Sequence, residues 1–425
     1  MSGRGCPPVP NSKGLRNQID RRHFLGTLAS AAPLAALGPA STLAAWPSGP
    51  APTVEAVEVF PITYPMDGRF KFFEDPQGTL TGRASAIVKI TASDGTVGWG
   101  ESIPIPKWSY ETLESVTTTL RQYLTPALLG RSVFDLAGAH RAMDQVVAPS
   151  FSTGQPMAKA GVDLALHDLV GRITGRSLPE LWGRSARSEI TLSWTLNPET
   201  LDDLPGLIQE GRRHGVEHFN VKVGAGREYD LSLCRRVREA APDGFLWADA
   251  NGGFAPAEIR SFVPDLTEAG IDVLEQPLPA NRLTAYRELR REAEVPILMD
   301  EGVVSPSTLM ELIRMDVLDG VAMKIPRCGG LYPAKRQIEI LRDAGLMVLG
   351  SGLTDPGISL AATLILYGSF GYDRPAALNG PQFIAESVLE DPFQPEEGVL
   401  PVPEGPGLGI EVDESKIDDL RVSLD

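Results

Sequence analysis

Five polar residues recur at a nearly constant interval through the second half of the chain. Lys222, Asp249, Glu275, Asp300 and Lys324 each follow a short apolar run, and successive members lie 27, 26, 25 and 24 residues apart. An interval of this size accommodates one β-strand followed by one α-helix. The carboxyl ends of parallel barrel strands meet at one rim, where barrel enzymes place their active sites. We therefore expect all five side chains to lie at the same level of one barrel.

The three acids of this series predict a metal site. Asp249, Glu275 and Asp300 end three consecutive predicted strands, so their negative charges would repel one another unless they were protonated or bound to a cation. Oxygen ligands with open coordination positions suit Mg²⁺, with Mn²⁺ as the alternative metal. The competing interpretation is that each acid caps a helix or pairs with an arginine. That would explain a single acid better than three acids in step with the strand interval.

The two lysines predict acid–base chemistry. Strands two and six of an eight-stranded ring lie opposite each other, so Lys222 and Lys324 should face each other across the rim. Burial and a nearby cation lower the pKa of a lysine and make it a usable general base. Such lysines could remove the proton α to the carboxylate of an acid bound to Mg²⁺, which would stabilise the resulting ene-diolate. The alternative is that both lysines form salt bridges with the rim acids.

A repeating pattern of strands and helices must position these residues. From residue 186 to residue 395, short apolar runs alternate with amphipathic helical stretches, which predicts an α/β fold with a modified (β/α)8 barrel. An open doubly wound sheet is the alternative, and the eighth strand is the least regular. The predicted strands are "EITLSWTL", "HFNVKV", "GFLWADAN", "DVLEQP", "PILMDE", "GVAMKI", "LMVLGSG" and "PAALNG".

The residues on either side of the predicted barrel indicate a second domain. Residues 53–185 begin with an alternating strand and a hairpin signal at Asp94-Gly95, and helical patterns follow, so we expect an α+β capping domain. Residues 396–425 begin with a stretch rich in proline and glycine. We expect this C-terminal segment to pack back on the capping domain.

Residues 1–45 predict an export signal of the twin-arginine type. The stretch "RRHFLGTLASAAPLAALGPASTLAA" has paired arginines, an apolar run and small residues near its end. This interpretation makes the twin-arginine export machinery a partner and the periplasm the location, with folding completed before export. A disordered tail with a chance arginine pair is the alternative. No other stretch has the 18 or more consecutive apolar residues of a membrane span.

Composition limits the other partners. A formal net charge of −16 argues against nucleic acid and anionic membranes, both of which are bound through basic patches. Apolar residues make up 42% and charged residues 22% of the chain, as in soluble globular proteins. The three cysteines, one of them in the predicted leader, imply no disulfide framework. We expect a small carboxylic acid as substrate, and the sequence leaves open whether the chain forms a homo-oligomer.

Longer stretches around these residues resemble a known family. The chain is similar to the mandelate racemase/muconate lactonizing enzyme family of the enolase superfamily from about residue 53 to residue 425. The resemblance implies a cap over a modified barrel, metal binding by the three acids above, and acid–base roles for the two lysines. It also implies that Glu301 holds the base lysine. The similar stretches are "GVDLALHDLVGRITGRSLPELWG", "NVKVG", "ADANGGF", "LEQPLP", "MDEG", "AMKIPRCGGL" and "LNGPQF".

Two stretches indicate the subgroup. The stretch "GSGLTDPG" after strand seven has no histidine, and strand six carries Lys324, which resembles the muconate-cycloisomerase-like subgroup. That subgroup includes cycloisomerases, succinylbenzoate synthases, N-acylamino-acid racemases and dipeptide epimerases. One departure stands out. The usual Lys-x-Lys of strand two is here Asn220-Val221-Lys222, and an asparagine cannot supply the charge that depresses the pKa of the second lysine. The Asp-x-Asp of dipeptide epimerases is missing from "PAALNGPQF".

The resemblance also implies where substrates are selected. In this family, specificity comes from cap loops, here near residues 69–73 and 104–110, and from the ends of strands seven and eight. The candidate substrate-binding residues are Asn220, Asn251, Asp355, Asn379, Trp108 and Tyr110.

These patterns favour a Mg²⁺-dependent racemase or epimerase, because each of two opposed lysines can exchange a proton with the α-carbon. A cycloisomerase or a dehydratase of the same superfamily is the alternative, since both share the first step. Two readings from other classes are a barrel aldolase that forms a Schiff base on a rim lysine and an exported binding protein without catalytic activity.

Overall fold

The computed structural model describes residues 50–150 and 153–424, so the predicted export signal at residues 1–45 lies outside the described residues. The described chain begins with an antiparallel sheet of three strands in the order β1-β2-β3. The predicted hairpin at Asp94-Gly95 is confirmed, because β2 and β3 pair in antiparallel register on either side of it and Gly95 adopts a φ of 86°. The strands are β1 (Val54–Tyr64), β2 (Arg83–Ala92) and β3 (Val97–Ser102).

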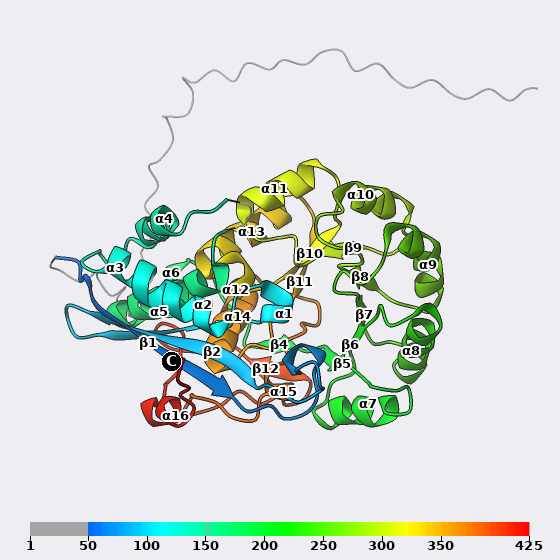
Figure 1. Cartoon of the computed structure of the whole chain (residues 1–425), viewed down its shortest axis with the longest axis horizontal. Helices are drawn as coiled ribbons and strands as arrows, with labels where there is room; N and C mark the ends of the chain where they lie inside the picture. Colours follow the sequence, from blue (N-terminus) through cyan, green and yellow to red (C-terminus); the bar gives the residue numbers. More distant parts are fainter. Residues whose placement is uncertain (1–49, 151–152, 425) are drawn as a thin grey trace, which may run out of the picture. The chain divides into compact units, whose positions relative to one another are not determined.

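A long buried helix, α5, packs against this sheet. Two glycines of β3 allow the close approach: a Cβ on Gly100 would lie 2.0 Å from the carbonyl oxygen of Gly161, and one on Gly98 would lie 2.4 Å from that of Ala165. Figure 1 shows α5 and α2 lying along β1 and β2. The helices of this domain are η1 (Lys71–Phe73), α1 (Pro106–Ser109), α2 (Leu113–Thr118), η2 (Thr119–Leu124), α3 (Thr125–Leu128), α4 (Leu136–Val146), α5 (Pro156–Thr174) and α6 (Leu178–Leu181).

A parallel sheet of seven strands follows, in the order β11-β10-β9-β8-β7-β6-β5. In Figure 1, helices α7 to α11 lie outside the arc of these strands. The strands are β5 (Trp194–Leu196), β6 (Phe219–Lys222), β7 (Leu246–Asp249), β8 (Val273–Glu275), β9 (Ile297–Met299), β10 (Gly320–Met323) and β11 (Met347–Gly350). The helices are α7 (Leu204–Arg213), α8 (Arg227–Ala240), α9 (Pro256–Glu268), α10 (Leu283–Glu292), α11 (Pro306–Arg314), α12 (Ile325–Cys328), α13 (Leu331–Asp343), α14 (Gly357–Ser369) and α15 (Gly380–Phe383).

The ring closes differently from the prediction. The predicted eighth strand is not a regular strand: only Ala376 and Ala377 form parallel bridges, to Leu192 and Ser351 respectively, before α15 begins. These two bridges still join the first and last parts of the sheet, so the open doubly wound alternative is wrong. The predicted first strand is also divided, because β4 (Glu189–Thr191) pairs antiparallel with β12 (Val399–Pro401) and only β5 joins the barrel.

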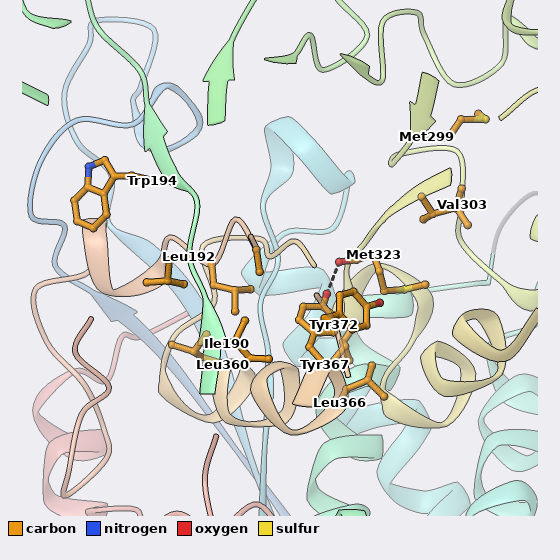
Figure 2. Close-up of a cluster of buried hydrophobic side chains, with 14 of the residues drawn as sticks. Ile190, Leu192, Trp194, Met299, Val303, Met323, Leu360, Leu366, Tyr367 and Tyr372 are labelled. Atoms are coloured by element: carbon orange, nitrogen blue, oxygen red, sulfur yellow. Dashed lines mark hydrogen bonds between the residues drawn. The ribbon is translucent and has the colours of Figure 1, made fainter. Parts of the chain in front are cut away.

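The barrel interior is filled by side chains. Trp247 is fully buried in a cluster with smaller residues from other parts of the ring, which include Ala322 of β10 and Ala377. A larger cluster packs the helices against the strands, and Figure 2 shows Tyr367 of α14 reaching Met323 at the end of β10. The Tyr367 hydroxyl lies within hydrogen-bonding distance of the carbonyl oxygens of Met323 and Ser351, which fixes the chain immediately before Lys324.

The C-terminal segment contacts the N-terminal sheet. The amide of Thr63 donates to the Leu420 carbonyl at 3.1 Å, and the amide of Val422 donates to the Pro61 carbonyl at 3.0 Å. On the neighbouring strand, Lys89 pairs with Glu414 of α16 (Glu414–Asp419) at 2.7 Å. Among the helices of the described ranges, none is both long and apolar enough to cross a membrane.

Candidate active site

The five residues of the 24-to-27-residue series meet at the carboxyl rim of the barrel. Lys222 and Asp249 are paired in register at the ends of β6 and β7, and Asp249 is paired in the same way with Glu275 at the end of β8. Asp300 directly follows β9, and Lys324 directly follows β10. The strand interval therefore places these five side chains at one level, which we call the barrel mouth.

Ion pairs connect the lysines to the acids. Lys222 Nζ lies 2.5 Å from Asp249 Oδ2. Lys324 Nζ lies 2.7 Å from Asp300 Oδ2 and 3.2 Å from Glu275 Oε1. The three acids are each about 1% exposed. Since an unpaired buried charge costs several kcal/mol, these contacts account for the presence of five ionisable groups in the core.

The surrounding charges shift the pKa values of the mouth residues. Burial alone would raise the pKa of Asp249, but the charges of Lys222 and Lys324 outweigh it and the net shift is downward. Burial and the negative charge of Asp249 raise the pKa of Glu275 well above its usual range. Burial alone would lower the pKa of Lys324, but Asp300 and Glu275 raise it. The acids and lysines therefore determine one another's protonation.

The acids of the mouth provide a donor set for a hard cation. Asp249, Glu275 and Asp300 offer only oxygen atoms from three adjacent strands, and Asp300 Oδ1 accepts no hydrogen bond from any of the described residues. Within residues 50–150 and 153–424, no group of three or more acidic, histidine or cysteine side chains has the arrangement that could hold a metal ion. Asp249 and Asp300 contact the ammonium groups of Lys222 and Lys324 instead. The donor chemistry thus fits a divalent cation, which would take over the counter-charge role of the lysines.

A tryptophan from the cap covers the mouth. Trp108 of α1 places its ring 5.2 Å from Lys324 Nζ and 5.7 Å from Lys222 Nζ. Phe72 of η1 stacks on the Trp108 ring with the centroids 4.3 Å apart. Two segments of the N-terminal domain therefore contribute aromatic surface above the charged rim of the barrel.

One charged residue of the mouth was not among the predicted site residues. Arg327 is 5% exposed, and its Nε lies 2.9 Å from Asp300 Oδ1, although the two atoms are not aligned as a hydrogen bond. Its Nη1 donates to the carbonyl oxygen of Trp108 at 3.3 Å. The signal was available in the stretch "KIPRCGG", because Arg327 lies three residues after Lys324, about one helical turn, on α12.

Comparison with known proteins identifies the family. Residues 73–183 match the mandelate racemase/muconate lactonizing enzyme N-terminal domain, and residues 206–416 match the enolase C-terminal domain-like family. Muconate cycloisomerase 1 of Rhodococcus opacus is 30% identical over 343 residues, which cover 79% of this chain and 90% of that protein. The chain belongs to the mandelate racemase/muconate lactonizing enzyme family.

Two further relatives show the range of this family. N-succinyl-L-Arg/Lys racemase of Bacillus cereus is 27% identical over 88% of this chain and 99% of that protein. The crystal structure of 2-chloromuconate cycloisomerase from Rhodococcus opacus is 26% identical, with a TM-score of 0.79 over 87% of this chain and 99% of that one. The predicted fold class, a modified barrel with an N-terminal cap, is confirmed. The relatives are isomerases of the enolase superfamily, and this chain is an enzyme of the same kind.

Glu301 occupies the position that the family resemblance gives to a residue holding the base lysine. Here its Oε1 accepts hydrogen bonds from Trp108 Nε1 at 2.9 Å and from Asn251 Nδ2 at 3.3 Å. Its Oε2 has no hydrogen-bond partner in the described part of the chain. Burial and the charge of Asp300 raise the pKa of Glu301 to about 7. Glu301 therefore connects barrel and cap, and its role toward Lys324 stays a prediction.

Two asparagines of the predicted set lie at the mouth. The backbone amide of Asn251 donates to Asp249 Oδ1 at 2.8 Å, and Asn251 adopts a φ of 44°, which side-chain-bearing residues rarely adopt. Asn220 is buried two residues before Lys222, where the family usually has a lysine, and its Nδ2 makes only a long contact of 3.5 Å with the Trp247 carbonyl. Because asparagine is neutral, Lys222 has one cation fewer beside it than it would have with the lysine that is usual in the family.

The other predicted substrate residues differ in position. Asp355 is buried and accepts hydrogen bonds from Ser359 Oγ at 2.7 Å and from the Leu353 amide at 3.1 Å, so one oxygen holds the first turn of α14 and the other holds the loop after β11. Asn379 is buried beside the first barrel strand, and its Oδ1 has no partner among the described residues. Tyr110 is 60% exposed and is not brought to the mouth with Trp108.

Proposed function

We propose that this protein is a Mg²⁺-dependent racemase or epimerase that removes the proton α to a carboxylate through an ene-diolate. One observation supports the proposal most strongly: two lysines from opposite sides of the barrel, Lys222 and Lys324, both contact the acids that would hold the metal. If the carboxylate of a substrate bound the metal held by those acids, the α-carbon of the substrate would lie between the two amines.

The two lysines would divide the proton transfers. One lysine removes the α-proton from one face, and the other donates a proton to the opposite face, which inverts the configuration. Mg²⁺ held by Asp249, Glu275 and Asp300 would stabilise the negative charge of the deprotonated acid. If that counter-charge were supplied, Lys324 would no longer be the counter-cation of Asp300 and Glu275, and the cause of its raised pKa would be removed.

A cycloisomerase is the second candidate, and the relatives favour it. Proteins named muconate or chloromuconate cycloisomerase are about 30% identical to this chain over four fifths of its length. A cycloisomerase uses the same deprotonated acid as its intermediate but needs only one lysine for the proton. The two candidates therefore differ in whether both lysines exchange protons.

The test is a screen of carboxylic acids in D₂O with the Mg²⁺-loaded enzyme, followed by NMR for loss of the α-proton signal. Exchange accompanied by inversion supports the racemase, and exchange with ring closure or loss of a β-substituent supports a cycloisomerase or dehydratase. Binding without exchange would contradict both enzymatic proposals. Trapping of substrate by borohydride would instead indicate a Schiff base on a lysine.

We also propose export to the periplasm by the twin-arginine route, on the basis of the leader sequence alone. Replacement of Arg21 and Arg22 by lysines should leave the precursor folded and active in the cytoplasm. The measurement is the distribution of activity between periplasmic and cytoplasmic fractions. Normal export of that variant would contradict the twin-arginine interpretation, while the proposed reaction would be unaffected.

A further inference from the structure

Arg83, the first residue of β2, is a fully buried cation that the proposed reaction does not use. Burial lowers the pKa of Arg83 to about 10, while the charges of Asp355 and Glu101 oppose this shift, so the guanidinium stays protonated at neutral pH. All five N–H groups of this guanidinium donate to backbone carbonyl oxygens, at distances of 2.7 to 3.2 Å. The acceptors are the carbonyl oxygens of Ala84, Ile103, Pro104, Leu353 and Thr354.

These acceptors belong to both domains. Pro104 shortly precedes α1, the short cap helix that carries Trp108 over the barrel mouth. Leu353 and Thr354 belong to the barrel, in the loop between β11 and α14. Leu353 is fully buried in the same hydrophobic cluster as Trp108, together with residues of the cap sheet and of its helices. Arg83 therefore connects the loop after β11 to the cap segment that leads to Trp108.

A buried acid of the cap makes the complementary contact with the same part of the barrel. Glu101 of β3 accepts a hydrogen bond from the Ser359 amide, in the first turn of α14, at 3.0 Å. The other carboxylate oxygen of Glu101 accepts hydrogen bonds from Tyr64 Oη and Ser85 Oγ, both at 2.8 Å. The cap thus binds carbonyl oxygens of this barrel loop through a cation, and a free amide of the following helix through an anion.

The loop after β11 has a backbone conformation that its sequence disfavours. Thr354 adopts a φ of 54°, which is rare for a β-branched residue, and its buried hydroxyl has no hydrogen-bond partner among the described residues. Such a conformation persists only where surrounding contacts impose it. One of these contacts is the hydrogen bond from Arg83 Nε to the Thr354 carbonyl oxygen at 3.1 Å. We therefore expect the loop to change its conformation when the guanidinium is removed.

We propose that Arg83 is a positioning residue that ties the loop after β11 to the cap segment carrying Trp108, so that the two segments open and close over the barrel mouth as one unit. The loop after β11 then serves as a link between the domains, instead of the role in substrate selection that the family resemblance implies for it. The inference rests on the proposed function only in treating the barrel mouth as the reaction centre.

The first measurement is amide hydrogen exchange of the protein without substrate, followed by mass spectrometry of peptides covering residues 102–109 and 350–356. In the wild-type protein the two segments should share one opening equilibrium, because a single opening event exposes both. Arg83→Lys keeps the positive charge but replaces five donors in a rigid plane by three. Both segments should then exchange about 30-fold faster, since hydrogen bonds from a charged group to each of them are lost.

The second measurement is the proposed reaction itself. With a substrate found by the D₂O screen, kcat for α-proton exchange should fall about 10²-fold in Arg83→Lys, because a misplacement of about 1 Å can cost that much. Mg²⁺ affinity should stay as in the wild-type protein, since Arg83 contacts none of the proposed ligands. Arg238→Lys is the matched control. Arg238 also donates to several backbone carbonyl oxygens, but all of them belong to the barrel, so both segments and kcat should be unchanged.

Several results would overturn the inference. Different opening equilibria for the two segments in the wild-type protein would show that they move separately. Faster hydrogen exchange of only one segment in Arg83→Lys, or an equal increase over the whole chain, would also contradict the link. An unchanged kcat in that variant would remove the positioning role. If both segments respond together but no carboxylic acid undergoes α-proton exchange, the proposed reaction is contradicted and the link between the domains stands.

Discussion

The two lysines of the barrel mouth lie in different surroundings. Lys324 is almost fully buried between Asp300 and Glu275, and these acids raise its pKa. Lys222 contacts one acid, Asp249, and lies 6.0 Å from the Phe70 ring of the cap. Two residues of one type, placed opposite each other by the strand interval, are therefore not equivalent bases. Lys324 is paired with two of the metal-site acids and Lys222 with Asp249, while Trp108 of the cap lies near both lysines and Phe70 lies near Lys222.

Replacement of Asp300, which contacts Lys324 and is also a proposed metal ligand, should have the largest effect. Asp300→Asn removes a proposed metal ligand and the shorter of the two contacts of Lys324, so proton exchange should fall about 10³-fold or more from both faces of the substrate. The measurements are the exchange rate in D₂O and Mg²⁺ binding by titration. Asp202→Asn, at an exposed acid outside the mouth, is the matched control. Full exchange in excess chelator would refute the ligand assignment for Asp300.

Removing either lysine alone should separate the two faces. Lys222→Ala should stop exchange from one enantiomer and leave exchange from the other to Lys324, and Lys324→Ala should show the reverse. Loss of a positioned general base costs about 10² to 10⁴ in rate. Each variant is followed by NMR with both enantiomers across a range of pH, because each lysine also affects the charge near the other. Loss of exchange from both enantiomers at every pH in both variants would show that the lysines act as a unit.

Adding a charge on the Lys222 side should reduce the difference between the two lysines. Asn220→Lys places a second cation two residues before Lys222, which disfavours the protonated form and lowers its pKa. The acidic limb of the pH–rate profile for the Lys222 face should move to lower pH by about one unit, while the limb for the Lys324 face should move less. Asn220→Gln adds no charge and serves as the control. Equal movement of both limbs would mean that position 220 does not act on Lys222 selectively.

Replacement of Trp108, whose ring lies near both lysines, should have the smallest effect. Trp108→Phe removes the hydrogen bond to Glu301 but keeps an aromatic ring above both lysines. A hydrogen bond contributes about 1 kcal/mol, so we expect a decrease of about fivefold in kcat/KM, similar for both enantiomers. Glu301→Gln removes the carboxylate charge but keeps an oxygen that can accept the hydrogen bond from the indole. This variant should therefore distinguish the effect of losing the hydrogen bond from the effect of losing the charge. A strongly one-sided decrease would assign Trp108 to one lysine.

The sequence predicted the rim better than the contacts made across it. Asp249 and Lys324 were identifiable because a strand end fixes both the height and the direction of a side chain, and the strand interval appears directly in the sequence. The hydrogen bond from Trp108 to Glu301 joins segments far apart in the chain, and no local pattern encodes which loop residue reaches the barrel. Tyr110 illustrates this, because it lies two residues from Trp108 and is 60% exposed, whereas Trp108 is 9% exposed.

Closure of the barrel was predictable only in part for a related reason. Regular strands are recognised from several paired residues, but the segment near residue 376 pairs at only two positions before α15 begins. Likewise, the run at residues 189–196 looks like one strand, although its first half pairs with β12 far along the chain. Long-range pairing decided both cases, and hydrophobic periodicity carries no information about it.

The outer edge of β1 has a consequence for synthesis of the protein on the ribosome. β1 is the edge strand of the N-terminal sheet, and Pro61 and Thr63 are covered on their free side by Leu420 and Val422. While translation proceeds, the N-terminal part of the chain emerges long before its covering segment exists. An uncovered strand edge can pair with another chain, which is a route to aggregation. The nascent protein therefore carries an open edge until almost all of its described residues have been made, and this is the interval in which a chaperone would protect it.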